Sequence, residues 1–146
     1  MLRIRVPRFG TASSPRASRI LSATKSIDTK CEVQLRNMLW RMGLRFRKNV
    51  RDLPGKPDIV FTKQRVAVFC DGDFWHGRDW PTRKRRLHKG ANALYWTKKI
   101  GANIQRDRLL DQGLERLGWK VLRLWESDIL KDPYRCALEV VELVRG

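Results

Sequence analysis

The sequence predicts an α/β domain in which helices cover both faces of a central sheet. Three observations support this fold class. The chain has 146 residues, enough for one hydrophobic core and too few for two domains. Its expected elements run in the order helix, three strands, helix, strand, helix. The segment 65–70 is almost entirely apolar, as expected of a central strand with both faces covered.

Periodicity and flanking residues place the individual elements. Apolar residues recur at helical spacing after Asp28 or Thr29, either of which can cap a helix, until a glycine ends the pattern. The segment 45–50 alternates like a first strand, and 59–61 with 65–70 is typical of a hairpin. We then expect an exposed loop (77–92), a helical region with a break near a glycine (93–117), a strand (119–125) and a closing helix (133–144).

Residues 1–27 are predicted to be a basic, flexible arm in front of a folded domain over 28–146. The arm contains prolines, a glycine and several serines but no sustained apolar periodicity. Its part 18–25 could form a short helix on a partner, and disorder is the equal alternative. No apolar run approaches the length of a membrane span, and the three cysteines include no CxxC pair. We therefore expect a cytoplasmic protein without a disulfide framework.

The charge of the chain indicates a nucleic-acid partner. Lys and Arg number 32 against 15 Asp and Glu, which gives a net charge of +17. A generically basic protein is the alternative, but the cations are clustered, which favours a surface that contacts phosphates. The densest cluster follows the chemical motifs described next and consists of Arg83, Lys84, Arg85, Arg86 and Lys89.

Two neighbouring strands are predicted to deliver acids to one place. Asp58 follows a Pro-Gly-Lys-Pro turn and opens an apolar strand, and the next strand ends in Cys70, Asp71, a glycine and a further Asp. Magnesium prefers oxygen ligands, so Cys70 would contribute its backbone carbonyl, with Asp71 a weaker candidate. The alternative for Asp58 is a carboxylate that only caps the turn. His76 follows at once, and its imidazole could take a proton from water that attacks a phosphodiester beside the metal.

Two acids on helices and three aromatic residues complete the candidate site. Glu32 lies in the first turn of its helix, where a carboxylate also complements the helix dipole. Asp107 could orient His76 or simply pair with neighbouring arginines. The aromatics either wedge between base pairs or pack beneath the site loop, and they are Phe74, Trp75 and Trp96.

Motifs spread over about 18–126 carry a family resemblance. They are Leu53-Pro-Gly-Lys-Pro-Asp58, Phe74-Trp75-His76, Asn103-x-x-Arg106-Asp107 and Gly118-Trp119-x-Val121-Leu122. With these motifs the chain resembles the very short patch repair endonucleases. The resemblance implies a three-layer α/β/α restriction-endonuclease-like core with a mixed central sheet. It also implies Mg²⁺-dependent nicking of duplex DNA on the 5′ side of thymine in a T·G mismatch.

The resemblance assigns a role to each candidate residue. Asp58 would bind the metal with the Cys70 carbonyl, His76 would be the catalytic histidine, and Glu32 and Asp107 would support them. Phe74, Trp75 and Trp96 would intercalate, and the arm over 1–27 would clamp the DNA from the minor-groove side.

Two departures from the family pattern concern the same region. The family can carry a second active-site histidine where this chain has Asp71. Its structural zinc site would fall on Asp73, Arg78, Trp80 and Ser127, none of which is a cysteine or histidine. We therefore predict no structural zinc. An Asp73–Arg78 ion pair and packing of Trp80 would brace the loop instead.

The sequence thus predicts a Mg²⁺-dependent, strand-specific DNA endonuclease that acts on mismatched double-stranded DNA. We expect a monomer in the cytoplasm, at the nucleoid, with mismatch-repair proteins as partners. The alternatives are a restriction-fold nickase with a different target, from a defence system or mobile element, and a DNA-binding protein without catalysis.

Overall fold

The computed structural model of the protein describes residues 27–87, 90 and 92–146. The predicted arm over 1–27 therefore lies outside the described residues except for Ile27, and so does Lys89 of the basic cluster. The predicted boundary between arm and folded domain stays a prediction.

Within the described residues, a four-stranded sheet has the order β1-β2-β3-β4. The first three strands pair antiparallel, and β3 pairs with β4 in parallel. The sheet is therefore mixed, as the resemblance implies. The strands are β1 (Arg47–Lys48), β2 (Ile59–Phe61), β3 (Val66–Asp71) and β4 (Lys120–Trp125).

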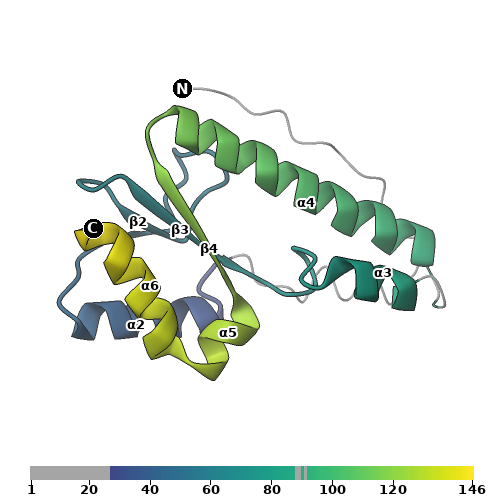
Figure 1. The fold of residues 1–146 in the computed structure, drawn as a ribbon, viewed down its shortest axis with the longest axis horizontal. Helices are drawn as coiled ribbons and strands as arrows, with labels where there is room; N and C mark the ends of the chain where they lie inside the picture. The colour runs from purple at the N-terminus through teal and green to yellow at the C-terminus, as the bar shows by residue number, and fades with distance from the viewer. Residues whose placement is uncertain (1–26, 88–89, 91) are drawn as a thin grey trace.

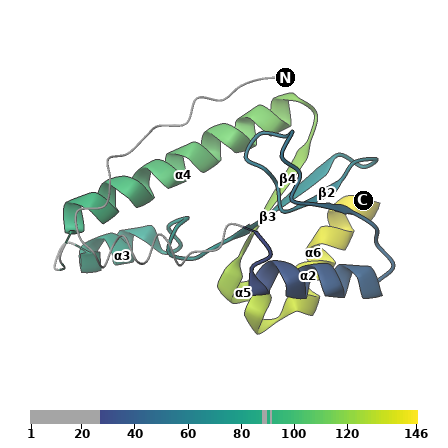
Figure 2. The ribbon, with the colours of Figure 1, turned by 180° about the vertical axis from the view of Figure 1, so that it is seen from behind.

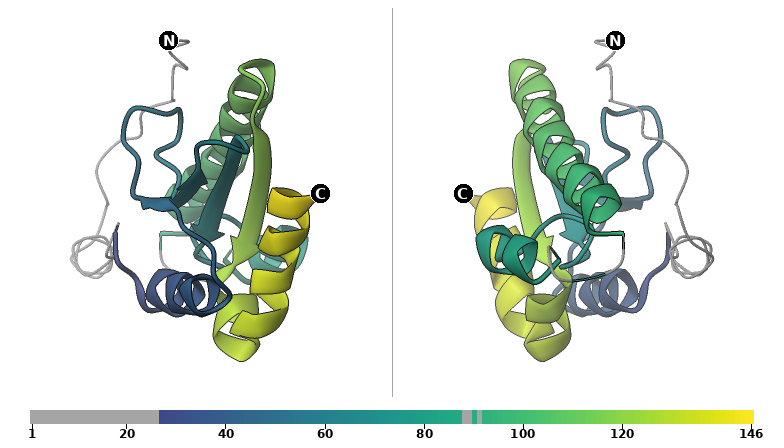
Figure 3. Two further views of the ribbon diagram at one scale, coloured as in Figure 1. Left: turned by 90° about the vertical axis from the view of Figure 1, so that its left-hand side faces the viewer. Right: turned by 90° about the vertical axis from the view of Figure 1, so that its right-hand side faces the viewer.

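Helices lie on both sides of this sheet, and the three layers of the expected fold are visible in Figures 1 and 3. The long helix α4 covers one side, and α2, α5 and α6 cover the other. Helix α3 runs alongside the N-terminal part of α4 (Figure 2). The helices are α2 (Lys30–Arg41), α3 (Trp80–Leu87), α4 (Ala93–Arg116), α5 (Glu126–Lys131) and α6 (Pro133–Arg145).

Side chains of β3 alternate between two hydrophobic clusters, one on each side of the sheet. Val66 and Val68 are buried in the cluster that includes residues of α2 and α6, and Cys70 packs against it. Ala67 and Phe69 are buried with α4 on the other side. Because alternate residues of a strand point to opposite faces, Cys70 faces α2 and Asp71 faces α4. The end of β3 therefore supplies side chains to both sides of the sheet.

Several elements agree with the sequence prediction. Helix α2 begins after Thr29, whose side chain accepts a hydrogen bond from the Glu32 N–H, as expected of a cap. The predicted hairpin is β2 and β3, paired with Ile59 opposite Val68. The strand before α5 and the closing helix also lie within a residue or two of their predicted positions.

Other predictions about elements were wrong. The predicted loop over 77–92 contains α3, which is so rich in charge that it has no apolar stripe for a periodicity search to detect. Helix α4 is unbroken at Gly101. Helix α5 follows β4 directly and has no side-chain cap. The sequence therefore contains no N-cap signal from which the start of α5 could be predicted. The first strand is shorter than predicted and spans two residues, Arg47 and Lys48.

No helix among the described residues is both long and apolar enough to cross a membrane.

We expect Gly77→Ala to destabilise the fold more than Gly43→Ala. Both glycines have positive φ, +74° and +88°, which costs an alanine about 1–2 kcal/mol. At Gly77 the new Cβ would also lie 2.5 Å from Ile104 Cδ1 of α4, whereas at Gly43 nothing lies within 4 Å. The added crowding should cost roughly 1–3 kcal/mol. Urea unfolding of both variants measures the difference, and equal losses would contradict a tight turn–α4 contact.

Candidate active site

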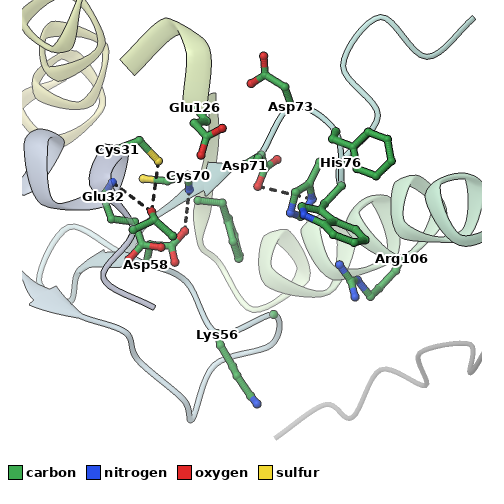
Figure 4. Close-up of a pocket in the computed structure, with 16 residues that line it drawn as sticks. Cys31, Glu32, Lys56, Asp58, Cys70, Asp71, Asp73, His76, Arg106 and Glu126 are labelled. Carbon is green, nitrogen blue, oxygen red and sulfur yellow. Dashed lines mark hydrogen bonds and ion pairs between the residues drawn. The ribbon is translucent and has the colours of Figure 1, made fainter. Parts of the chain in front are cut away.

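A cavity of about 590 Å³ opens where β3 ends. Figure 4 shows Cys31, Glu32 and Asp58 gathered on one side of it, and Asp71 and His76 on the other. The structure thus brings the predicted metal-binding and catalytic residues to one place. The lining residues are Thr29, Cys31, Glu32, Gly55, Lys56, Asp58, Phe69–His76, Arg106 and Glu126.

Asp58 is held against the backbone of β3. Its N–H donates to the Val68 carbonyl at 3.0 Å, and its Oδ2 accepts from the Cys70 N–H at 2.7 Å. In an extended strand the N–H and C=O of one residue point to the same side. The Cys70 carbonyl is therefore directed to the side of β3 on which Asp58 lies. These two oxygens suit the hard, oxygen-binding cation that the sequence predicts.

Glu32 forms a close carboxyl pair with Asp58. It is 2% exposed, and its Oε2 accepts from the Asp28 N–H at 2.9 Å, so it also caps α2. Burial, followed by the charge of Glu32 and a hydrogen bond with it, raises the pKa of Asp58 to about 8, although the Cys70 N–H works in the opposite direction. A divalent cation held by Asp58 would replace the proton that this carboxyl retains.

The thiol of Cys70 lies next to that of Cys31 (Figure 4). A hydrogen bond with Cys31, and then burial, raises the pKa of the Cys70 thiol well above its usual range. A protonated thiol is a poor metal ligand. The role of the Cys70 backbone carbonyl as a ligand stays a prediction.

On the α4 side, His76 lies between two carboxylates. Its Nδ1 is 2.6 Å from Asp107 Oδ2 and 3.7 Å from Asp71 Oδ1. Both acids are buried, at 8% and 4% exposed. Burial raises the pKa of Asp71, opposed by His76 and Arg123. Among the described residues, this Asp–His–Asp group has ligand atoms within 4.8 Å of one another, close enough to hold a metal ion.

The turn that carries His76 is fastened to α4 at more than one point. The His76 N–H donates to the Gly72 carbonyl at 3.1 Å, which closes the turn on itself. Asn103 of α4 donates from Nδ2 to the Trp75 carbonyl at 2.9 Å. Together with the Asp107 contact, these bonds fix the backbone and the ring of His76.

Sequence reasoning missed Arg123 and Asp111. Arg123 of β4 contacts both Asp71 and Asp107 as well as Asp111 of α4. Burial, the largest effect, lowers the pKa of Arg123, but the hydrogen bond with Asp111 and the surrounding carboxylates outweigh it and raise that pKa. A signal was present: Arg123 interrupts an apolar strand at a position where alternation predicts a side chain facing the α4 core.

The four positions of the family's zinc site hold a different structure here. The Arg78 guanidinium donates to Ser127 Oγ and to Asp128 Oδ1, the latter at 2.9 Å. Asp73 Oδ1 accepts from the Ser127 N–H at 3.1 Å, and its carbonyl accepts from the Arg78 N–H at 2.9 Å. Because an arginine and a serine replace metal-binding side chains, these residues do not fit zinc.

The expected Asp73–Arg78 side-chain ion pair was wrong. Among the described residues, Arg78 pairs with Asp128 of α5, which the sequence analysis had not considered because α5 was not predicted.

The three aromatic residues form one cluster. The ring of Phe74 is 5.3 Å from that of Trp75 and 5.4 Å from that of Trp96, and the Trp75 and Trp96 rings are 5.7 Å apart. Phe74 and Trp75 line the cavity, but Trp96 is only 7% exposed. Trp96 thus fits the packing alternative in this structure, while Phe74 and Trp75 are placed to contact a ligand in the cavity.

Helix α3 presents the basic cluster. Lys84, Arg85 and Arg86 are exposed and Arg83 is half-buried. No ion pair within the described part of the chain joins these four residues to an acid, so their charges are available to phosphates.

A mixed sheet between helical layers, with acids and a histidine around a cavity at its strand ends, is the architecture of the restriction-endonuclease-like nucleases. The family model described as DNA mismatch endonuclease Vsr matches residues 12–82. The chain belongs to this family, and it is a DNA-nicking endonuclease.

Curated relatives support this assignment over most of the chain. The type II nicking enzyme V.NmeDIP of Neisseria meningitidis serogroup C is 46% identical over 86% of this chain and 83% of its own length. The type II nicking enzyme V.HpaIIP of Haemophilus parainfluenzae is 39% identical over 84% and 86%. The DNA mismatch endonuclease Vsr of Escherichia coli (strain K12) is 37% identical over 75% and 68%.

We expect the folded protein to require no zinc. Elemental analysis should find no stoichiometric zinc, and a zinc chelator should leave the thermal unfolding midpoint unchanged, because hydrogen bonds of Arg78 occupy the family's zinc positions. Arg78→Met should lower that midpoint, and Arg116→Met, an exposed control, should not. Bound zinc whose removal unfolds the protein would contradict this expectation.

We expect the metal-free protein to lose stability as the pH rises from about 4 to about 8. Over this range folded Asp58, with its pKa raised to about 8, keeps a proton that the unfolded chain has released. The free energy of unfolding therefore falls toward high pH. Urea unfolding in EDTA should show this slope in the wild type and a flatter one in Asp58→Asn. Mg²⁺ should restore more stability at pH 8 than at pH 5, and identical slopes would refute the assignment.

Proposed function

We propose that the protein nicks one strand of double-stranded DNA with Mg²⁺ as cofactor, on the 5′ side of thymine in T·G mismatches. The observation that carries the proposal is that Asp58 and His76 line the same cavity at the end of β3. The name of the Escherichia coli relative, DNA mismatch endonuclease Vsr, supports the choice of substrate.

The metal would lie at the α2 side of the cavity. Asp58 and the Cys70 carbonyl would hold Mg²⁺, and Glu32 would support Asp58 through their carboxyl pair. When bound, the ion would stabilise the negative charge that develops on the attacked phosphate. Asp71 faces the other side of the sheet, next to His76, so we propose that it contributes to the histidine side of the site rather than to this metal.

His76 would act as the general base. An ionised Asp107 can only accept a hydrogen bond, so the hydrogen of the short contact belongs to His76 Nδ1. The lone pair of Nε2 then remains for a proton from the attacking water. In this arrangement Asp107 selects the tautomer and orients the ring, and it also stabilises the imidazolium that forms.

DNA would be bound by the basic helix and the cavity aromatics. The α3 residues Arg83, Lys84, Arg85 and Arg86 would neutralise backbone phosphates, with Lys89 beyond them. Phe74 and Trp75, which line the cavity, would wedge between base pairs and stack on the bases. Mismatched pairs cost less to unstack than matched ones, which favours a mismatch as the target.

A nickase with a different DNA target is the second candidate. Two of the relatives just described are named type II nicking enzymes, and those names specify no mismatch. The family membership argues against the third possibility, a DNA-binding protein without catalysis.

We expect Asp58→Ala and His76→Ala each to lower the nicking rate on a T·G duplex by at least about 100-fold, because each removes a group that acts on the reacting phosphate or water. DNA affinity should remain nearly unchanged. Asp52→Ala, which removes an exposed carboxylate near the same turn, is the matched control. The assay uses a strand-labelled duplex with Mg²⁺ or EDTA, and wild-type cleavage by either variant would remove that residue from the mechanism.

The same assay with a panel of duplexes separates the two candidate functions. The repair function requires that T·G be cleaved in preference to the matched pairs T·A and C·G and to other mismatches. The nick should lie 5′ to the thymine. Equal cleavage of matched duplexes that share one sequence would instead support a nickase with a different target.

A further inference from the structure

Arg123 occupies an unusual position for a cation. It lies in β4 opposite Phe69 of β3, and its guanidinium carbon sits 4.1 Å from the centre of the Phe69 ring. Its side chain is only 18% exposed. A charge in such surroundings is costly unless acids compensate it, so its partners define what it does.

Three carboxylates from two elements surround this guanidinium. Nη1 donates to both oxygens of Asp71 at 3.1 and 3.2 Å, and it lies 3.6 Å from Asp107 Oδ1. Nε donates to both oxygens of Asp111 at 2.9 and 3.0 Å. Arg123 thereby links the end of β3 to two successive turns of α4.

Asp107 is shared between Arg123 and His76, and Arg106 Nη2 also lies 3.8 Å from its Oδ1. Its Oδ2 contacts the imidazole at 2.6 Å, while its Oδ1 faces the guanidinium. Asp71 is likewise placed between the two, 3.7 Å from the His76 nitrogen and in hydrogen-bond contact with Arg123. The contact that orients the ring thus depends on two acids that Arg123 holds next to each other.

Without the guanidinium these acids would repel each other. Like charges a few ångströms apart in a largely buried site interact far more strongly than in water. Asp71 and Asp107 would move apart or turn toward solvent, and His76 would lose the partners that fix its ring.

We propose that Arg123 is a positioning residue for DNA nicking: it holds Asp71 and Asp107 beside His76 and so keeps the imidazole aligned with the reacting phosphate. This inference rests on the proposed function of His76. It also gives Asp71 a role in this chain, as one half of an acid–arginine pair where relatives can carry a second histidine.

The same contacts argue against a cation in the Asp71–His76–Asp107 group. The guanidinium already donates to both Asp71 oxygens, and it approaches the Asp107 oxygen that His76 leaves free. A metal ion there would have to displace Arg123 from a largely buried position.

The first experiment measures kcat and KM for nicking by Arg123→Met and Arg123→Lys. Methionine keeps the apolar contact with Phe69 and removes the charge. Lysine keeps the charge but lacks the planar set of N–H donors of the guanidinium. We expect Arg123→Met to lower kcat roughly 10- to 100-fold, the range for groups that orient a catalytic residue, with KM changed less than about twofold. Arg123→Lys should recover part of kcat.

Two controls separate positioning from folding. Circular dichroism and thermal unfolding establish that each variant is folded at the assay temperature. Arg145→Met, at the exposed C-terminal end of α6, should behave as the wild type. A kcat loss that only matches the unfolded fraction, or no kcat loss in folded Arg123→Met, would overturn the proposal.

A double-mutant cycle provides the decisive comparison. If Arg123 compensates Asp71, then Arg123→Met should cost kcat several-fold less in an Asp71→Asn background than in the wild type, because the repulsion is already gone. Equal fold-losses in both backgrounds would show that Arg123 only braces the fold, and would also overturn the proposal.

Failure of this inference can be told from failure of the proposed function. His76→Ala is assayed in parallel on the same duplex. If it nicks normally, the function assigned to His76 is wrong. If it is inactive while Arg123→Met has a normal kcat, only the role of Arg123 is wrong.

Discussion

Alternation of side chains at the end of β3 is the constraint on which the site depends. Cys70 faces α2 and Asp71 faces α4, although they are neighbours in the chain. One strand end therefore serves two groups of residues, the Glu32–Asp58 carboxyl pair on one side and the acids around His76 on the other. A shift of one residue in the register of β3 would exchange the sides and dismantle both groups.

The negative charge of the buried acids is compensated differently in the two groups. On the α2 side burial and the neighbouring Glu32 raise the pKa of Asp58 to about 8, so this carboxyl keeps a proton near neutral pH when no metal is bound. On the α4 side the Arg123 guanidinium lies among the carboxylates of Asp71, Asp107 and Asp111, and Arg106 also approaches Asp107. The metal site that we propose is therefore the one on the α2 side. In the proposed function, this division lets Asp58 bind a metal and Asp107 orient His76 in one cavity without competition for one cation.

Sequence patterns predicted the candidate residues because they lie in short motifs at strand and helix ends. Asp58, Cys70 and His76 fall within one hairpin and the turn after it, so their proximity follows from local geometry. Arg123 was not predicted because its contact with Asp71, 52 residues away in the chain, depends on the parallel pairing of β3 with β4. A side-chain contact between residues so far apart in the chain leaves no periodic pattern in the sequence from which it could be predicted. Helices α3 and α5 were missed for a local reason, since neither has an apolar stripe with a capped start.

The loss of metal-binding residues at the zinc positions shifts support for His76 onto α4. Zinc would join four side chains directly, whereas here hydrogen bonds of Arg78 and Asp73 hold the turn to α5. A partly exposed ion pair of this kind contributes little stability by itself. The turn is fixed more firmly on its other side, by the Asn103 bond and the Asp107–His76 contact, both from α4. Since Arg123 ties α4 to β3 and β4, the geometry of the imidazole depends on how α4 packs on the sheet.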